Sequence, residues 1–130
     1  MTLSKNDDTP QFPILRGESV SESGEFSGCA RLVTTPEGLN REWASDDIVV
    51  LEDDLDSFFS LNPKALADLF SVVRVVIAEF GESVGQFATT AIENTAIGII
   101  GVKDATHVLE DGMHIRIEAT ENQCDIYFID

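Results

Sequence analysis

Three short apolar runs, each of strand length, punctuate the middle of the chain. They are DIVVLE (47–52), RVVIAEF (74–80) and IGIIGV (97–102). An unbroken run of this kind is typical of a strand that is buried on both faces, because neither set of alternating side chains meets water. We therefore predict three buried strands here, and a further strand at GCARLVTT (28–35).

Two helices are predicted between these strands. The first covers 63–72, where Asn62 is a favourable N-cap and Pro63 suits the first helical position. The second covers 86–95, after a turn that contains two glycines. Both segments carry apolar residues at helical spacing. Strands and helices that alternate in this way indicate a parallel sheet.

The two ends of the chain follow other patterns. Residues 113–119 and 124–130 alternate between apolar and polar side chains, which predicts an antiparallel pair. Residues 17–27 are small and acidic, and we expect a loop or an edge region there. Residues 1–13 are polar with two prolines and are expected to form a disordered tail. The predicted fold class is α/β, with one domain at 14–130 built from a central, mainly parallel sheet and an antiparallel layer.

The length and composition of the chain are those of a single domain with a hydrophobic core. The chain has 130 residues, of which 43% are hydrophobic. No apolar run approaches the roughly 20 residues that a membrane span needs. The polar, acidic N-terminus is unlike a signal peptide. We therefore expect a cytoplasmic protein with no membrane partner.

Charge is the most unusual property of the composition. The net charge is −16, with 24 acidic residues against 8 basic ones. Nucleic-acid binding needs clusters of Lys and Arg, which the sequence lacks, so we expect no nucleic-acid partner. Such a charge keeps any protein soluble, and it is also typical of halophilic proteins in a salt-rich cytoplasm. The scarcity of lysine beside an undiminished apolar fraction favours halophilic adaptation.

No motif for a metal or cofactor is present. The only thiols and imidazoles lie outside the spacings of zinc sites: Cys29, Cys124, His107 and His114. The acidic stretch with Asp53, Asp54 and Asp56 has the oxygen ligands that a divalent cation takes, but we favour an acidic, solvated loop. We expect neither a metal nor a cofactor.

Four stretches, in this order and spacing, resemble one known family. They are GEFSGCARLV (24–33), DDIVVLEDDL (46–55), the segment 81–101, and DATHVLEDGMHIRI (104–117). Together they resemble the swivelling phosphohistidine domain, the mobile domain of phosphoenolpyruvate-utilising enzymes. The resemblance implies a three-layer β/β/α swivelling fold.

The same resemblance implies that the phosphoryl carrier has been lost. Gln86 occupies the position of the family's phosphorylated histidine, Glu82 that of its second glycine, and Gly85 that of its serine. A carboxamide offers no nucleophile comparable to a neutral imidazole. Gly81, Glu82, Gly85 and Gln86 would then form a vestigial phosphoryl-carrier site, and the protein would not be an enzyme.

Three functions are compatible with this interpretation. The first is a non-catalytic, stand-alone homologue of the mobile domain that acts as an interaction or regulatory module with a protein partner. The second is the detached mobile subunit of a split phosphoenolpyruvate synthase or dikinase-like system, which requires a phosphoacceptor other than Gln86. The third is a small anion or metabolite-binding domain that uses the helix start near Gly85 and Gln86.

Charge leads to a prediction about salt. Like charges repel in the compact state, and in molar salt the Debye length falls to about 3 Å, which screens that repulsion. We expect the melting temperature to rise steadily as KCl is increased from dilute to molar, as measured by calorimetry. A melting temperature that stays flat across this range would contradict the halophilic interpretation.

Overall fold

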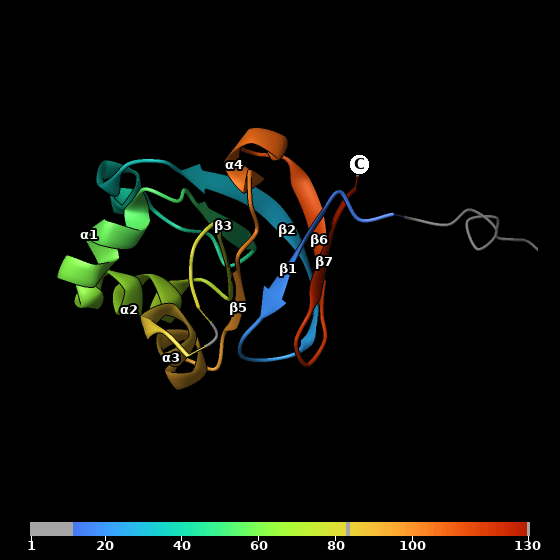
Figure 1. Ribbon diagram of the computed structural model, residues 1–130. Coiled ribbons are helices and arrows are strands. Elements are labelled where there is room, and N and C mark those ends of the chain that lie inside the picture. The colour runs from blue at the N-terminus through green and yellow to red at the C-terminus, as the bar shows by residue number, and fades with distance from the viewer. Residues whose placement is uncertain (1–11, 83, 130) are drawn as a thin grey trace, which may run out of the picture.

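Seven strands close into a mixed β-barrel in the computed structural model, which describes residues 12–82 and 84–129 (Figure 1). Around the barrel the strands follow the order β1-β5-β4-β3-β2-β6-β7. Their bounds are β1 Leu15–Ser19, β2 Gly24–Val33, β3 Asp47–Leu51, β4 Val75–Ala78, β5 Ile97–Ile100, β6 His114–Ala119 and β7 Cys124–Phe128.

Three of the seven neighbouring strand pairs are parallel. β2 pairs with β3, β3 with β4, and β4 with β5, all in parallel. The parallel pairing predicted for the three apolar runs is therefore confirmed, and so is the antiparallel pair at the C-terminus, which is β6 with β7. The remaining pairs are antiparallel: β1 pairs with both β5 and β7, and β2 pairs with β6.

The predicted three-layer β/β/α arrangement is wrong, because the parallel and antiparallel strands belong to one closed barrel. Two strands join them. Residues 24–29 of β2 pair with β6, and residues 29–33 of the same strand pair with β3. In β1, residues 15–17 pair with β7 and residues 18–19 pair with β5. Each joining strand changes partner midway, so neither sheet keeps a free edge and no second layer exists.

A glycine lies at or next to each place where a joining strand changes partner. A Cβ atom on Gly28 would lie 1.9 Å from the backbone oxygen of Asp46, and one on Gly17 would lie 2.4 Å from a methyl group of Val102. Glycine in a strand often marks a bend or a close approach of another segment. The absence of a side chain at these two positions lets the neighbouring backbone or side chain come close enough to close the barrel.

Two hydrophobic cores share the parallel strands. One fills the barrel, with Ile48, Val50 and Ile77 pointing inward to meet residues of β6 and β7. The other lies between the outer face of the barrel and the helices, and contains the residues that alternate with the first set, such as Val49 and Val76. Every residue of β3, β4 and β5 is buried for this reason, as the continuous apolar runs predicted.

Helices α1 (Leu55–Leu61), α2 (Pro63–Val72) and α3 (Gln86–Glu93) cover one side of the barrel (Figure 1). The first predicted helix is confirmed as α2, and the second, α3, ends two residues earlier than predicted. α1, β1, the short α4 (Ala105–Val108) and the 3-10 helix η2 (Pro36–Asn40) were not predicted. Pro63 takes the first position of α2 as expected, but the Asn62 side chain donates to the carbonyl of Phe58 instead of capping α2.

Within the part of the chain that the structure describes, no helix combines the length and the apolar character required to cross a membrane. Most of the tail predicted for residues 1–13 lies outside the described residues, so that prediction stays untested.

Gly28 provides a test of how the barrel closes. We expect Gly28→Ala to lower the free energy of unfolding by about 1–3 kcal/mol, as overpacking does, because the new methyl group meets backbone that cannot move aside. Chemical denaturation in molar KCl measures the change. Gly85→Ala is the control, since its Cβ would lie 3.4 Å from its nearest neighbour, an ordinary contact. Equal stability of the two variants would contradict this account of the barrel.

Candidate functional site

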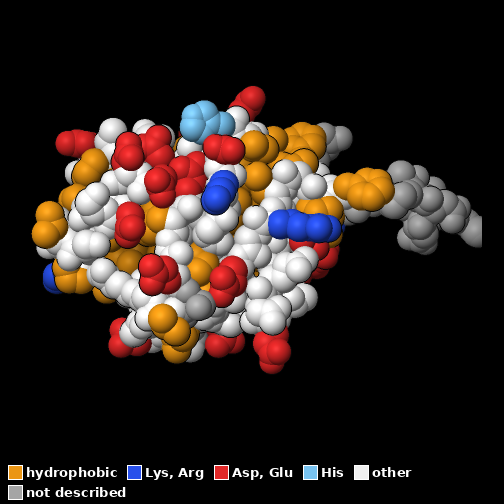
Figure 2. Space-filling model, in the orientation of Figure 1, with side chains coloured by type: hydrophobic (Ala, Val, Ile, Leu, Met, Phe, Trp, Pro, Cys, Tyr) orange, Lys and Arg blue, Asp and Glu red, His pale blue; other side chains and the backbone are white. Residues whose placement is uncertain are grey.

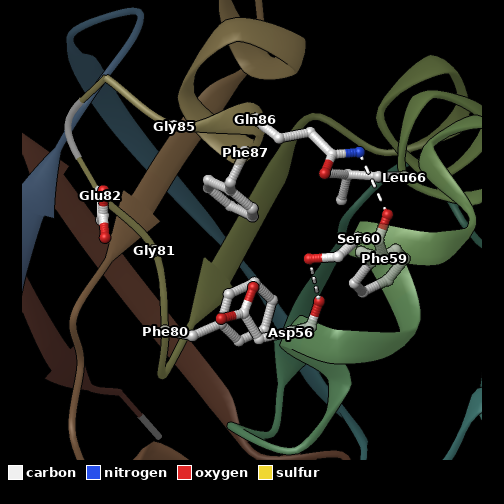
Figure 3. A pocket seen from close by; sticks show the side chains of 10 residues that line it. All are labelled: Asp56, Phe59, Ser60, Leu66, Phe80, Gly81, Glu82, Gly85, Gln86 and Phe87. Atoms are coloured by element: carbon white, nitrogen blue, oxygen red, sulfur yellow. Dashed lines mark hydrogen bonds between the residues drawn. The ribbon is translucent and has the colours of Figure 1, made fainter.

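A pocket of about 240 Å³ opens where the parallel strands β3 and β4 end, between α1 and the start of α3 (Figure 3). In α/β proteins, ligands commonly bind outside the carboxyl ends of parallel strands. The pocket is lined by Asp56, Phe59, Ser60, Leu66, Phe80, Gly81, Glu82, Gly85, Gln86 and Phe87.

Aromatic rings form the wall of the pocket. Phe59 of α1, Phe80 after β4 and Phe87 of α3 are all buried. The ring centroids of Phe59 and Phe80 are 6.3 Å apart, and those of Phe80 and Phe87 are 6.1 Å apart. Such pairs contribute packing energy beyond their buried area. This wall is part of the core between the helices and the barrel, so it is rigid.

Gln86 is the first residue of α3 and reaches across to α1. Its amide nitrogen donates a hydrogen bond of 3.2 Å to the backbone carbonyl of Phe59 (Figure 3). A carbonyl only accepts, so the nitrogen must face it and the orientation of the amide is determined. The amide oxygen accepts no hydrogen bond from residues 12–82 or 84–129. It remains available as an acceptor beside the pocket.

The rim of the pocket is acidic. Asp56 on α1 and Glu82 on the loop after β4 are both exposed, and they stand on different segments of the rim. Ser60, one turn after Asp56, donates its hydroxyl to the backbone carbonyl of Asp56. Acidic side chains are spread over the whole face shown in Figure 2, with few basic ones among them. The pocket therefore lies in a strongly negative surface.

Glu79 connects the loops that surround this edge of the barrel. Its carboxylate accepts hydrogen bonds from the backbone of Asp53 at 2.8 Å and from the backbone and hydroxyl of Thr106 at 2.8 and 2.7 Å. Partial burial by itself raises the pKa of Glu79, but these hydrogen bonds outweigh that effect and leave the pKa below its ordinary value. Glu79 thus holds the loop before α1 and the helix α4 to the end of β4.

The four residues predicted as a vestigial site all line this pocket: Gly81, Glu82, Gly85 and Gln86. Sequence reasoning missed the half that α1 and α2 supply, which includes Asp56, Ser60 and Leu66. The only signal was the acidic stretch with Asp53, Asp54 and Asp56, which we considered as a cation site. In the structure Phe59 is 2% exposed and belongs to the core, whereas Phe58 and Trp43 are partly buried against it.

Neither thiol is part of this site. Cys29 and Cys124 are both free, and burial raises the pKa of the Cys124 thiol to about 12. A thiol with such a pKa is protonated and unreactive at neutral pH. In the described ranges, no three His, Cys, Asp or Glu side chains are grouped so that they could hold a metal ion.

Comparison with known proteins shows the fold but no family. The sequence matches no protein-family model and no curated protein. Among solved structures, it is similar to Thermococcus kodakaraensis aconitase X in its holo-form, with a TM-score of 0.57 and 18% identity over 86% of this chain and 96% of that one. It is also similar to a UPF0107 protein solved by NMR, with a TM-score of 0.64 and 14% identity over 93% and 100% of the two chains.

A third similar structure is MccF, the microcin C7 self-immunity protein, in an inactive mutant apo state. The TM-score is 0.57 and the identity 15%, over 88% of this chain but only 41% of that one. This chain therefore spans less than half the length of MccF. Identities this low establish a shared fold and nothing further.

The resemblance to the mobile domain of phosphoenolpyruvate-utilising enzymes is wrong. The structural neighbours are aconitase X, UPF0107 and MccF, and the chain forms a closed barrel of seven strands. The stretches that suggested the resemblance combine a glycine, a buried strand and an acidic loop, which many α/β folds share. The three functions that we drew from it, the interaction module, the split subunit and the anion-binding domain, are not supported.

Glu79 leads to a prediction about acid stability. The pKa of Glu79 is lower in the folded than in the unfolded state. Its contribution to the free energy of unfolding is therefore complete above the unfolded pKa, and it is lost as the pH falls through the folded pKa. We expect Glu79→Gln to lower the free energy of unfolding by about 1–2 kcal/mol at pH 7, a value reduced for partial exposure. Denaturation at a series of pH values should show this difference shrinking below about pH 4.

Glu82→Gln is the matched control for that experiment. Glu82 is exposed and its carboxylate accepts no hydrogen bond from the described residues, so the neutral amide should leave stability nearly unchanged at every pH. If Glu79→Gln and Glu82→Gln behave alike, the hydrogen bonds of Glu79 do not hold this edge together.

Proposed function

We propose that this protein is a non-catalytic subunit of an enzyme assembly of the aconitase X kind. In that role it binds, through the face that carries the pocket, a partner chain that holds the catalytic groups. The proposal places both chains in the cytoplasm.

The use of this barrel in known structures supports the proposal. The aconitase X chain is hardly longer than the region that it shares with this protein, since 96% of that chain is covered by the match. In MccF the similar region is 41% of a longer chain. Another MccF structure with this barrel is that of an active-site mutant, so MccF has an active site. In these cases the barrel occurs in a protein with an enzymatic activity, either as a short chain or as one part of a long one.

The observation that carries the proposal is a pair of exposed apolar side chains, one on each of the two segments that border the pocket. Leu61, at the end of α1, is 82% exposed, and Val84, beside Gly85 at the start of α3, is 88% exposed. Leu61 follows Ser60 and Val84 precedes Gly85, and both Ser60 and Gly85 line the pocket. When a partner chain covers such side chains, their burial removes apolar area from water and contributes to binding.

Replacing this apolar pair should abolish partner binding without unfolding the protein. We expect the double variant Leu61→Ser, Val84→Ser to recover at least about tenfold less partner than the natural protein. The measurement uses tagged protein expressed in the source organism, purified in molar KCl, with quantitative mass spectrometry of the bound chains. Both side chains are exposed, so the free energy of unfolding should change by only about 0.5 kcal/mol per site.

The control is the double variant Phe12→Ser, Val108→Ser, which removes two exposed apolar side chains away from the pocket. It should recover the same partner as the natural protein, identified by mass spectrometry. The mass of the complex, measured by light scattering, should equal that of this chain together with the partner. A natural protein that migrates alone at 14.2 kDa in molar KCl and recovers nothing specific would overturn the proposal.

A further inference from the structure

The pocket is smaller than a typical small-molecule site. Its volume is about 240 Å³, whereas ligand pockets usually hold roughly 300–1,000 Å³. Leu61 and Val84 stand exposed on its two sides, so whatever enters the pocket must also cover apolar surface around it. A single side chain that projects from a protein surface meets both conditions.

The polar groups of the pocket are suited to a cation. Asp56 and Glu82 carry negative charge on its rim, and the amide oxygen of Gln86 is held ready as an acceptor by the hydrogen bond from its nitrogen to Phe59. The start of α3 opposes this, because a helix N-terminus carries about half a positive charge. Two full carboxylate charges outweigh it, and the net charge of −16 adds to them.

The aromatic wall selects among cationic side chains. A guanidinium group stacks on aromatic faces and is less strongly hydrated than an ammonium group, so it enters a partly apolar pocket more easily. Phe59, Phe80 and Phe87 line the pocket and give it this partly apolar character. A second copy of this acidic chain is disfavoured as the occupant, because two surfaces of the same sign repel.

We propose that the pocket binds one arginine side chain of the partner protein. Its guanidinium group enters the pocket, donates to the amide oxygen of Gln86 and lies against the phenyl rings, while the carboxylates of Asp56 and Glu82 on the rim attract its positive charge. Leu61 and Val84 then contact the apolar surface around that arginine. This inference rests on the proposed function, since it names the residue type by which the partner is recognised.

The first test uses a probe in place of the partner. N-acetyl-arginine amide is titrated into the full-length, ¹⁵N-labelled protein at a fixed KCl concentration at which it is folded. N-acetyl-citrulline amide serves as the neutral control of the same shape. We expect shifts in the Gln86 side-chain amide and in the backbone amides of Phe59 and Gly85. The arginine probe should bind about five- to tenfold more tightly than the citrulline probe. Equal binding of the two probes, or shifts elsewhere only, would overturn the inference.

The second test removes the charges of the rim. The double variant Asp56→Asn, Glu82→Gln should weaken binding of the arginine probe about fivefold or more and reduce recovery of the partner. The control variant Glu93→Gln, Glu121→Gln removes the same number of exposed carboxylates away from the pocket and should bind the probe as the natural protein does. Melting temperatures confirm that each variant is folded. If the two variants weaken binding equally, general charge explains it and the inference is wrong.

These experiments separate the inference from the proposed function. Recovery of the partner could depend on Leu61 and Val84 and yet be unchanged in the variant Asp56→Asn, Glu82→Gln. That result supports the subunit role and contradicts recognition of an arginine. An arginine probe that binds at Gln86 in a protein without any specific partner supports the pocket's selectivity and rejects the subunit role.

Discussion

Burial of the parallel strands on both faces is the constraint on which the rest of this structure depends. Residues of β3, β4 and β5 point alternately into the barrel and out toward the helices, so each strand belongs to two cores at once. Apolar strands of this kind need cover on both sides. The antiparallel strands supply it on one side by closing the barrel, and α1, α2 and α3 supply it on the other. The carboxyl ends of the strands emerge between these two covers.

The pocket follows from that arrangement. Where β4 leaves the barrel, the chain passes through Phe80 and Gly81 before α3 begins, and α1 approaches from the end of β3. The phenyl rings at this junction complete the outer core, and the polar groups that follow them in the chain face solvent. Glu79 ties the neighbouring loops to the barrel. A rigid apolar wall with an acidic rim therefore arises where the outer core meets water.

The acidity of the chain and the groups that line the pocket both favour a basic partner. A surface with a net charge of −16 attracts basic partners and repels acidic ones, and it does so less strongly as salt rises. At high salt, long-range attraction is screened, and recognition then depends on close contacts. Exposed Leu61 and Val84 beside a pocket that is lined by aromatic rings provide such contacts, because apolar burial is strengthened rather than weakened by many salts.

Local pattern alone determined much of this protein. The continuous apolar runs specified β3, β4 and β5 and their parallel order, and Pro63 and the apolar stripe specified α2. Tertiary structure alone decided that the barrel closes. Pairing of β1 and β2 with two partners each joins residues far apart in the chain, and no local period records such a change of partner. For the same reason, the contribution of α1 to the pocket became visible only when long-range packing placed Phe59 against Gln86.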